Sequence, residues 1–224
     1  MLWHRDRSWR PRELDWRVAA FFLVGSFVFA VGSFPPYAQL VDPRLVAVTF
    51  FAGSIFFTAA GYSQFLQVIN TGDTAGHRFR FFSWEPRRML WWATLIQLAG
   101  TLFFNRSTAD AVLQNLSVAE VNRLVWAPDL FGSIAFLVAS HLAWLPVRGH
   151  SRRARSDDPD LWSAVLNYVG SIFFMLSAVA SVTLPTTDEI LNLTVVNAGT
   201  FLGAACFFAG AYLLLPPASG RPGR

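Results

Sequence analysis

The chain has 224 residues, of which 54% are hydrophobic, 16% are aromatic and only 14% are charged. Because soluble domains carry about a quarter charged residues, this composition excludes an ordinary water-soluble domain and indicates that lipid is the surrounding solvent. The net charge is +4, all basic residues are arginines, and the single cysteine excludes an intramolecular disulfide.

Six uncharged stretches follow one another along the chain. Each is long enough to hold the roughly 17–25 residues that cross about 30 Å of hydrocarbon as a helix. We therefore predict an all-α membrane protein with six transmembrane helices, and we expect no Asp, Glu or Arg deep inside a span. The stretches are 18–41, 45–71, 89–105, 130–147, 161–187 and 190–220.

A basic leader, residues 1–17, precedes the first span. No small-residue cleavage pattern follows it, so we expect the span to be retained rather than removed as a signal peptide. All arginines except Arg44, Arg106 and Arg123 fall in this leader, in the loops 71–88 and 147–160, or in the tail 217–224. Because positive charge is retained on the cytoplasmic side, this distribution predicts a plasma-membrane protein with its N-terminus and C-terminus in the cytoplasm.

The first predicted hairpin, residues 18–70, contains GSFVF and then GSIFF. The pattern Gly-[Ser/Thr/Ala]-x-x-Phe appears once in every apolar stretch, at similar spacing in the hairpins 89–146 and 161–216. Such recurrence indicates duplicated structure, so we predict three parallel-repeated helical hairpins related by an axis along the membrane normal. The pattern residues are Gly25, Phe29, Gly53, Phe57, Gly100, Phe104, Gly132, Phe136, Gly170, Phe174, Gly203 and Phe207, and Gly199 adds a Gly-x-x-x-Gly.

Glycine and phenylalanine four residues apart lie on the same face of a helix. In lipid, helices associate through close packing, and small residues let their backbones approach. We therefore interpret the pattern as a helix-packing surface, in which a glycine notch on one helix receives an aromatic ring from its neighbour. Ligand binding by these glycines is the alternative interpretation.

The loop 71–88 mixes arginine with aromatic residues, in the sequence GHRFRFFSWEPRR. We expect its rings to lie at the headgroup level while its arginines contact anionic lipid. A plain topology signal is the second interpretation, and stacking on nucleic acid is disfavoured because the loop joins two spans. The residues assigned to lipid headgroups are Arg78, Arg80, Trp84, Arg87 and Arg88.

Three amide side chains are candidates for a polar cavity. Gln97 and Asn167 each precede their pattern glycine by three residues and so share its helix face, and Asn197 lies near the outer end of the last span. Each amide either forms an interhelical hydrogen bond, worth about 0.6–2 kcal/mol, or lines a cavity.

A second polar set lies near the cytoplasmic ends of the spans. Tyr62, His141 and Tyr212 occupy equivalent positions in the three hairpins, opposite the Gly/Phe face. They are either interfacial anchors or a polar ring at the inner mouth of a path.

Capping signals mark three helix starts. Asp157, Asp158 and Asp160, with Pro159 in the first turn, are expected to cap the start of the fifth span, and a cation site is the alternative interpretation. On the outer side, SVAE from Ser117 predicts a short surface helix within hairpin 2, and TTDE from Thr186 predicts a cap for the last span.

Several stretches resemble the YrhK-like family of small bacterial membrane domains. They are FFSWEPRR with WW, QLAGTLFFN, WAPDLFGSIAFLVAS and NAGTFLGAACFFAGAYLLLP, within residues 80–216. The resemblance implies a helical membrane protein and transfers no catalytic residue, because the family has no agreed activity.

The sequence contains no convincing nucleophile–base pair, phosphate loop or metal-ligand spacing, so we expect no enzymatic activity, no metal and no cofactor. The leading hypothesis is a structural or accessory helix bundle that interacts with the anionic lipid bilayer and with a membrane protein partner or a second copy, but with no nucleic acid. The alternative is a small-solute transporter or channel with a polar path between the hairpins.

Overall fold

The structure is a computed structural model, and it describes residues 13–71, 79–150 and 158–216. The described backbone is all-helical, which confirms the predicted class, and its only strand-like pairing is a single bridge between Thr183 and Ile190. The helices are α1 (Leu14–Ser33), α2 (Pro35–Leu40), α3 (Pro43–Asn70), α4 (Met89–Ala111), α5 (Val118–Glu120), the π-helix η1 (Val121–Trp126), α6 (Ala127–His150), α7 (Pro159–Ala180) and α8 (Leu193–Leu214).

The helices begin where a short polar side chain can accept a hydrogen bond from the first turn. Asp158 caps α7 by accepting from the Asp160 amide at 3.0 Å, with Pro159 in the first position, as the sequence predicts. The predicted cap of the last helix is wrong. The side chain of Asn192 caps α8, and residues 186–189 form a turn in which Asp188 has a φ of 58°.

The capping box at Ser117 is present, but the expected short surface helix is not separate. Ser117 and Glu120 exchange hydrogen bonds, and the backbone continues through η1 directly into α6. Residues 118–150 are therefore one continuous helical run. A π-helical turn changes the rotation of the side chains without ending the helix.

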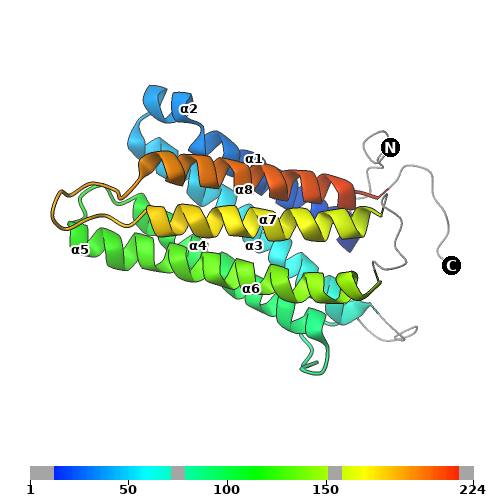
Figure 1. Cartoon of the computed structure of the whole chain (residues 1–224). Helices are drawn as coiled ribbons and strands as arrows, with labels where there is room; N and C mark the ends of the chain where they lie inside the picture. The colour runs from blue at the N-terminus through cyan, green and yellow to red at the C-terminus, as the bar shows by residue number, and fades with distance from the viewer. Residues whose placement is uncertain (1–12, 72–78, 151–157, 217–224) are drawn as a thin grey trace.

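Six long helices form a closed ring in the described part of the chain. α1 packs on α3, α3 on α4, α4 on α6, α6 on α7, α7 on α8, and α8 returns to α1. Figure 1 shows α1 beginning and α8 finishing at the same end of the bundle, here named the terminal end. The segment 181–192 lies at the other end with α2 and α5, and this is here named the cavity end.

Five helical segments in the described part of the chain are long and apolar enough to cross a membrane. They are Leu14–Ser33, Pro43–Asn70, Val118–Pro146, Pro159–Ala180 and Leu193–Leu214. α4 lies outside this set and carries Arg106 and Asp110 in its second half. The sixth span and the duplication of the hairpins therefore stay predictions.

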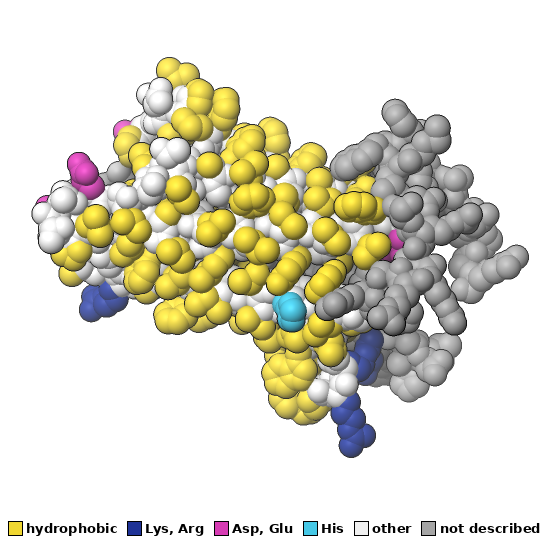
Figure 2. Space-filling model, viewed as in Figure 1, with side chains coloured by type: hydrophobic (Ala, Val, Ile, Leu, Met, Phe, Trp, Pro, Cys, Tyr) yellow, Lys and Arg dark blue, Asp and Glu magenta, His cyan; other side chains and the backbone are white. Residues whose placement is uncertain are grey.

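The bundle exposes apolar side chains and buries small polar ones. Figure 2 shows hydrophobic side chains covering most of the described visible face along the helices, with the described Asp, Glu and Arg side chains lying toward its ends. Phe27, Phe131 and Leu176 are more than half exposed, whereas Ser26, Ser54 and Ser171 are fully buried. This distribution suits a lipid solvent, and it indicates a membrane-embedded helical protein.

Candidate functional site: an aromatic core and the cavity beside it

Each pattern glycine faces the phenylalanine of the neighbouring helix in its predicted hairpin. A Cβ added at Gly53 would lie 2.5 Å from Cδ2 of Phe29, and one added at Gly25 would lie 3.0 Å from Cδ2 of Phe57. The same reciprocal contacts pair Gly100 with Phe136, Gly132 with Phe104, Gly170 with Phe207 and Gly203 with Phe174. These distances leave no room for a side chain, so each ring occupies the space that its glycine leaves free.

The six rings meet at the axis of the bundle in two layers. Phe57, Phe136 and Phe207, here named the closing triad, are each no more than 1% exposed. Their ring centroids lie 5.7–6.1 Å apart with steeply tilted planes, an arrangement that stabilises aromatic clusters. Phe29, Phe104 and Phe174 form the second layer, toward the cavity end.

The residue after each pattern glycine is small and fully buried, and several of these residues join neighbouring helix pairs. Ser54 of α3 shares a hydrogen bond of 3.0 Å with Thr108 of α4, and Ser171 of α7 shares one of 2.8 Å with Ser140 of α6. Ser26 of α1 has no partner for its hydroxyl among the described residues. In α3 and α7 the Gly-Ser pair therefore makes two contacts, one within a helix pair and one between pairs.

Gly199 does not follow the same rule. A Cβ there would lie 2.9 Å from the backbone oxygen of Phe173. α8 therefore approaches the backbone of α7 directly at this position, without an intervening ring.

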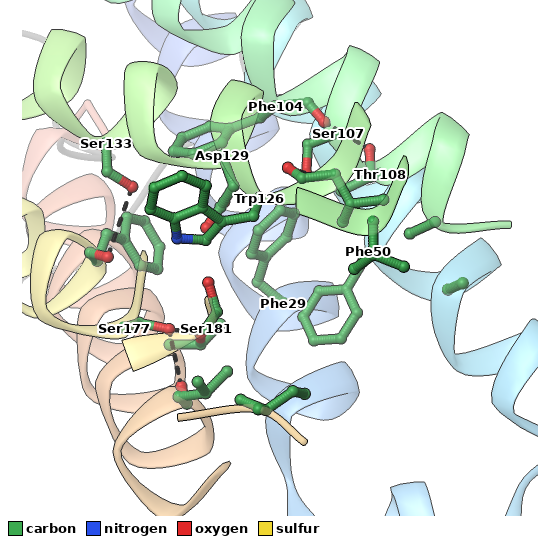
Figure 3. A pocket seen from close by; sticks show the side chains of 18 of the residues that line it. Phe29, Phe50, Phe104, Ser107, Thr108, Trp126, Asp129, Ser133, Ser177 and Ser181 are labelled. Atoms are coloured by element: carbon green, nitrogen blue, oxygen red, sulfur yellow. Dashed lines mark hydrogen bonds between the residues drawn. The ribbon is translucent and has the colours of Figure 1, made fainter. Parts of the chain in front are cut away.

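A cavity of about 250 Å³ lies at the cavity end, directly beside the second phenylalanine layer. Its wall comes from all six long helices, from η1 and from Thr183 and Ile190 of the segment 181–192. In Figure 3 the labelled side chains of α4, η1 and α6 lie on one side of this space. Ser177 of α7 and Ser181, the residue that follows α7, lie on the other side. The phenylalanine layers separate the cavity from the terminal half of the bundle.

Asp129 of α6 is the one ionisable side chain in the cavity wall. Among the residues that the structure describes, it has no hydrogen bond and no ion pair. The nearby Asp110 differs, because its Oδ2 lies 2.6 Å from Nε of Arg106 and it does not line the cavity. The cavity therefore contains an acidic side chain that has no ion-pair partner among the described residues.

Asp129 was not among the predicted site residues, because the fourth predicted span begins at residue 130. The structure corrects this boundary, since the helical run starts at Val118, about three turns earlier. The capping box at Ser117 was the available signal for that earlier start. The candidate span Val118–Pro146 therefore includes Asp129, which the predicted fourth span left outside.

Three serine hydroxyl groups of the wall donate to backbone carbonyls. Ser107 donates to Val125, Ser177 to Val196 and Ser181 to Ala178, at 2.8–2.9 Å. The indole Nε1 of Trp126 likewise donates to the carbonyl of Ala178 at 2.9 Å. Because their protons are used, these three hydroxyl oxygens can only accept hydrogen bonds from a ligand. This part of the wall therefore suits a ligand that donates hydrogen bonds or carries positive charge.

The amides considered for a polar cavity do not line this cavity. Gln97 is buried at 8% exposure in α4, and Asn167 is half-buried with its Oδ1 3.0 Å from the position of a Cβ on Gly210. Asn197 is half-buried near the start of α8. Asn167 therefore lies in the contact between α7 and α8.

Tyr62 and His141 are exposed at the surface of the bundle, and Tyr212 is half-buried. The Tyr62 hydroxyl donates to the carbonyl of Phe81 at 3.4 Å, and the His141 ring lies 5.7 Å from that of Tyr168. These three side chains do not line the cavity.

The described part of the basic and aromatic loop is attached to the end of α3. Arg80 donates to the carbonyl of Ile69, and Arg88 donates to that of Val68 at 2.9 Å. Both arginines also pair with Glu85. Partial burial alone raises the pKa of Glu85, but hydrogen bonds from Arg88 and Ser83 and the charges of Arg88 and Arg80 outweigh it and hold that pKa below its usual value.

Arg87 and Trp84 remain exposed at the terminal end, and Trp84 packs edge-on against Trp91 at 4.9 Å. Arg78 lies outside the described residues. Of the arginines assigned to lipid headgroups, two thus bind the protein itself and Arg87 faces outward.

No group of three or more His, Cys, Asp or Glu side chains in the described segments is placed to hold a metal ion. Comparison with protein-family models, curated proteins and solved structures finds no match for this chain.

Proposed function

We propose that the chain is a multi-pass plasma-membrane protein that acts as a non-enzymatic structural or accessory bundle, closed across its axis. The observation that carries this proposal is the closing triad, whose three rings are at most 1% exposed at the point where the helices converge. A polar solute crossing the bundle would have to separate these rings and lose its hydration among them.

The three-hairpin duplication and the YrhK-like resemblance belong to the same proposal. The support for the duplication is that the reciprocal glycine–phenylalanine contact recurs in the pairs α1–α3, α4–α6 and α7–α8. A contact repeated at equivalent positions is what duplication of one hairpin would leave behind.

A vesicle assay tests whether the bundle is closed. Liposomes that contain the purified protein should release trapped potassium and glycerol no faster than protein-free liposomes do. Steady release through the wild-type protein would overturn the proposal.

Two phenylalanine variants on α6 test the structural role of the triad. Phe136→Ala should destabilise the protein by about 3–5 kcal/mol, because it leaves a cavity in the core. Phe131→Ala is the control. Phe131 is 54% exposed, so its replacement should change the stability of the protein little.

The accessory role predicts a fixed complex in the membrane. Native mass spectrometry of the chain, extracted in lipid nanodiscs from cells that express it at natural levels, should show a constant ratio to one partner or to a second copy. An isolated monomer as the only species would contradict this role.

The exposed aromatic and basic side chains near the terminal end support contact with anionic lipid. Phe79, Phe81, Phe82 and Trp84 are each more than half exposed, and Arg87 is exposed beside them. Arg87→Gln should weaken the preference for anionic over neutral lipids in a native mass-spectrometry lipid-exchange assay by up to about 1 kcal/mol. An unchanged preference would contradict the contact.

The alternative function, a small-solute transporter, is favoured by one observation: the cavity beside the core contains an acidic side chain that has no ion-pair partner among the described residues. A transporter would show saturable exchange of a labelled solute across vesicles, although passive leak is absent. Such exchange would replace the accessory proposal.

A further inference from the structure

We propose that the cavity at the cavity end is a binding site for a small organic ammonium ion, with Asp129 as the counterion. The inference depends on the side chains of the cavity wall and not on whether the bundle is an accessory protein or a transporter.

The unpaired carboxyl group of Asp129 is the first reason. Asp129 is half-buried in the cavity wall, and its side chain has no ion pair among the described residues. A partly desolvated carboxyl group is costly to ionise without a nearby positive charge. The residues that line the cavity include no Arg or His. A cation within the cavity would supply the missing charge.

The hydrogen-bonding state of the wall is the second reason. Ser107, Ser177 and Ser181 use their protons on backbone carbonyls. At these three serines a ligand in the cavity therefore meets oxygen lone pairs, and Asp129 adds an acidic group. Such a wall disfavours an anion and favours a cation or an N–H donor.

The aromatic side chains distinguish an organic cation from a metal ion. Phe29, Phe50, Phe104, Phe174 and Trp126 all line the cavity. Aromatic faces attract ammonium groups, as in sites that recognise choline, whereas Ca²⁺ and Mg²⁺ require a shell of oxygen ligands. A wall with five aromatic rings and one carboxylate fits the organic cation.

The volume limits the size of the ligand. Pockets for drug-sized molecules measure about 300–1,000 Å³, and this cavity holds about 250 Å³. Tetramethylammonium and choline are suitable probes, because each combines a cation with methyl groups and neither is large.

The test compares charged and neutral probes of the same shape on the full-length protein in nanodiscs. Choline is titrated against 3,3-dimethyl-1-butanol, its neutral carbon analogue, with calorimetry and the melting temperature as readouts. We expect saturable binding of choline and a rise in Tm, and binding of the neutral analogue that is about tenfold or more weaker. Equal affinity of the two probes, or binding of neither, would overturn the proposal.

Two aspartate variants locate the site. Asp129→Asn should weaken choline binding about tenfold or more without lowering the Tm of the ligand-free protein, because Asp129 has no ion pair to lose among the described residues. Asp188→Asn is the matched control at the same end of the bundle, since Asp188 is exposed and asparagine tolerates its positive φ. Unchanged choline affinity in Asp129→Asn, or stabilisation of the wild type by sodium chloride alone at equal concentration, would contradict an ammonium site at Asp129.

Discussion

Gly53 and Phe29 show at the level of single residues how this bundle holds together. The Phe29 ring fills the notch above Gly53 and is itself fixed by Phe57 and Phe174, with ring centroids 5.2 and 6.2 Å away. The Phe29 ring cannot move away from a side chain larger than glycine without displacing the Phe57 and Phe174 rings. Glycine is required there for close approach, not for an unusual backbone angle.

The first prediction concerns this notch. Gly53→Ala should lower stability by about 1–3 kcal/mol, because the added methyl group overlaps a ring that cannot move. Gly61→Ala is the matched control on the same helix, since its Cβ would lie 3.5 Å from the nearest atom and alanine favours a helix. Chemical unfolding in mild detergent measures both. Equal stability of the two variants would show that the notch is not tight.

The second prediction concerns Glu85 and pH. The pKa of Glu85 is lower in the folded protein, so its contribution to stability is present above the pKa of the unfolded chain and is lost as pH falls through the folded pKa. The Tm difference between wild type and Glu85→Gln should therefore be largest near neutral pH and shrink in acid. A difference that does not change between neutral pH and strong acid would contradict the ion pairs with Arg80 and Arg88.

Among the structural elements, the π-helix η1 links the cavity wall to the segment that covers it. Asn122 lies in η1, donates to the carbonyl of Thr183 at 2.7 Å and accepts from the Thr183 amide at 3.0 Å. This two-bond contact resembles a strand pairing and fixes the segment 181–192 against the bundle.

The third prediction follows from that contact. Asn122→Ala leaves both backbone groups of Thr183 unpaired, which should cost about 1–3 kcal/mol and make the segment 181–192 easier to cleave by protease. Asn115→Ala is the control, because Asn115 is exposed in the preceding connection. Limited proteolysis with mass spectrometry detects the cleavage, and similar cleavage of both variants would contradict the role of Asn122.

At the scale of the whole molecule, the ring of alternating helices places the start of α1 and the finish of α8 at the same end. The arginine distribution then predicts that this terminal end faces the cytoplasm.

The fourth prediction tests the orientation with single cysteines in a Cys206→Ala background. Asp188→Cys should react with a membrane-impermeant maleimide added to intact cells, because the arginine distribution predicts that the cavity end faces outward. Arg87→Cys at the terminal end should react only after the cells are opened. The reverse pattern would mean that the bundle is inserted the other way.

Much of the element level could be predicted from local sequence. Apolar length predicted long helices, and Asp158 with Pro159 predicted the start of α7, because a cap depends on residues that are close in the chain. The start of the fourth long helix could not be placed from apolar length. In the sequence, an acidic residue such as Asp129 indicates the end of an apolar span, although a cavity can accommodate it inside the bundle.

The amides show the opposite error. Gln97 and Asn167 were considered for a cavity because they are polar within apolar stretches, yet neither lines the cavity. Whether a side chain faces a neighbour, lipid or a cavity depends on the rotation of every helix in the ring, and a single helix does not encode that rotation.

The sequence by itself determined that this chain is helical, that its long segments suit a bilayer, and that glycine and phenylalanine share one face in each. These properties depend on the period of the helix and on the solubility of side chains, which are local. Only the tertiary structure decided that six rings meet at one axis, that three of them close it, and that Asp129 faces a cavity beside them. Those features require residues from helices distant in sequence to converge, and their positions are set by packing between helices.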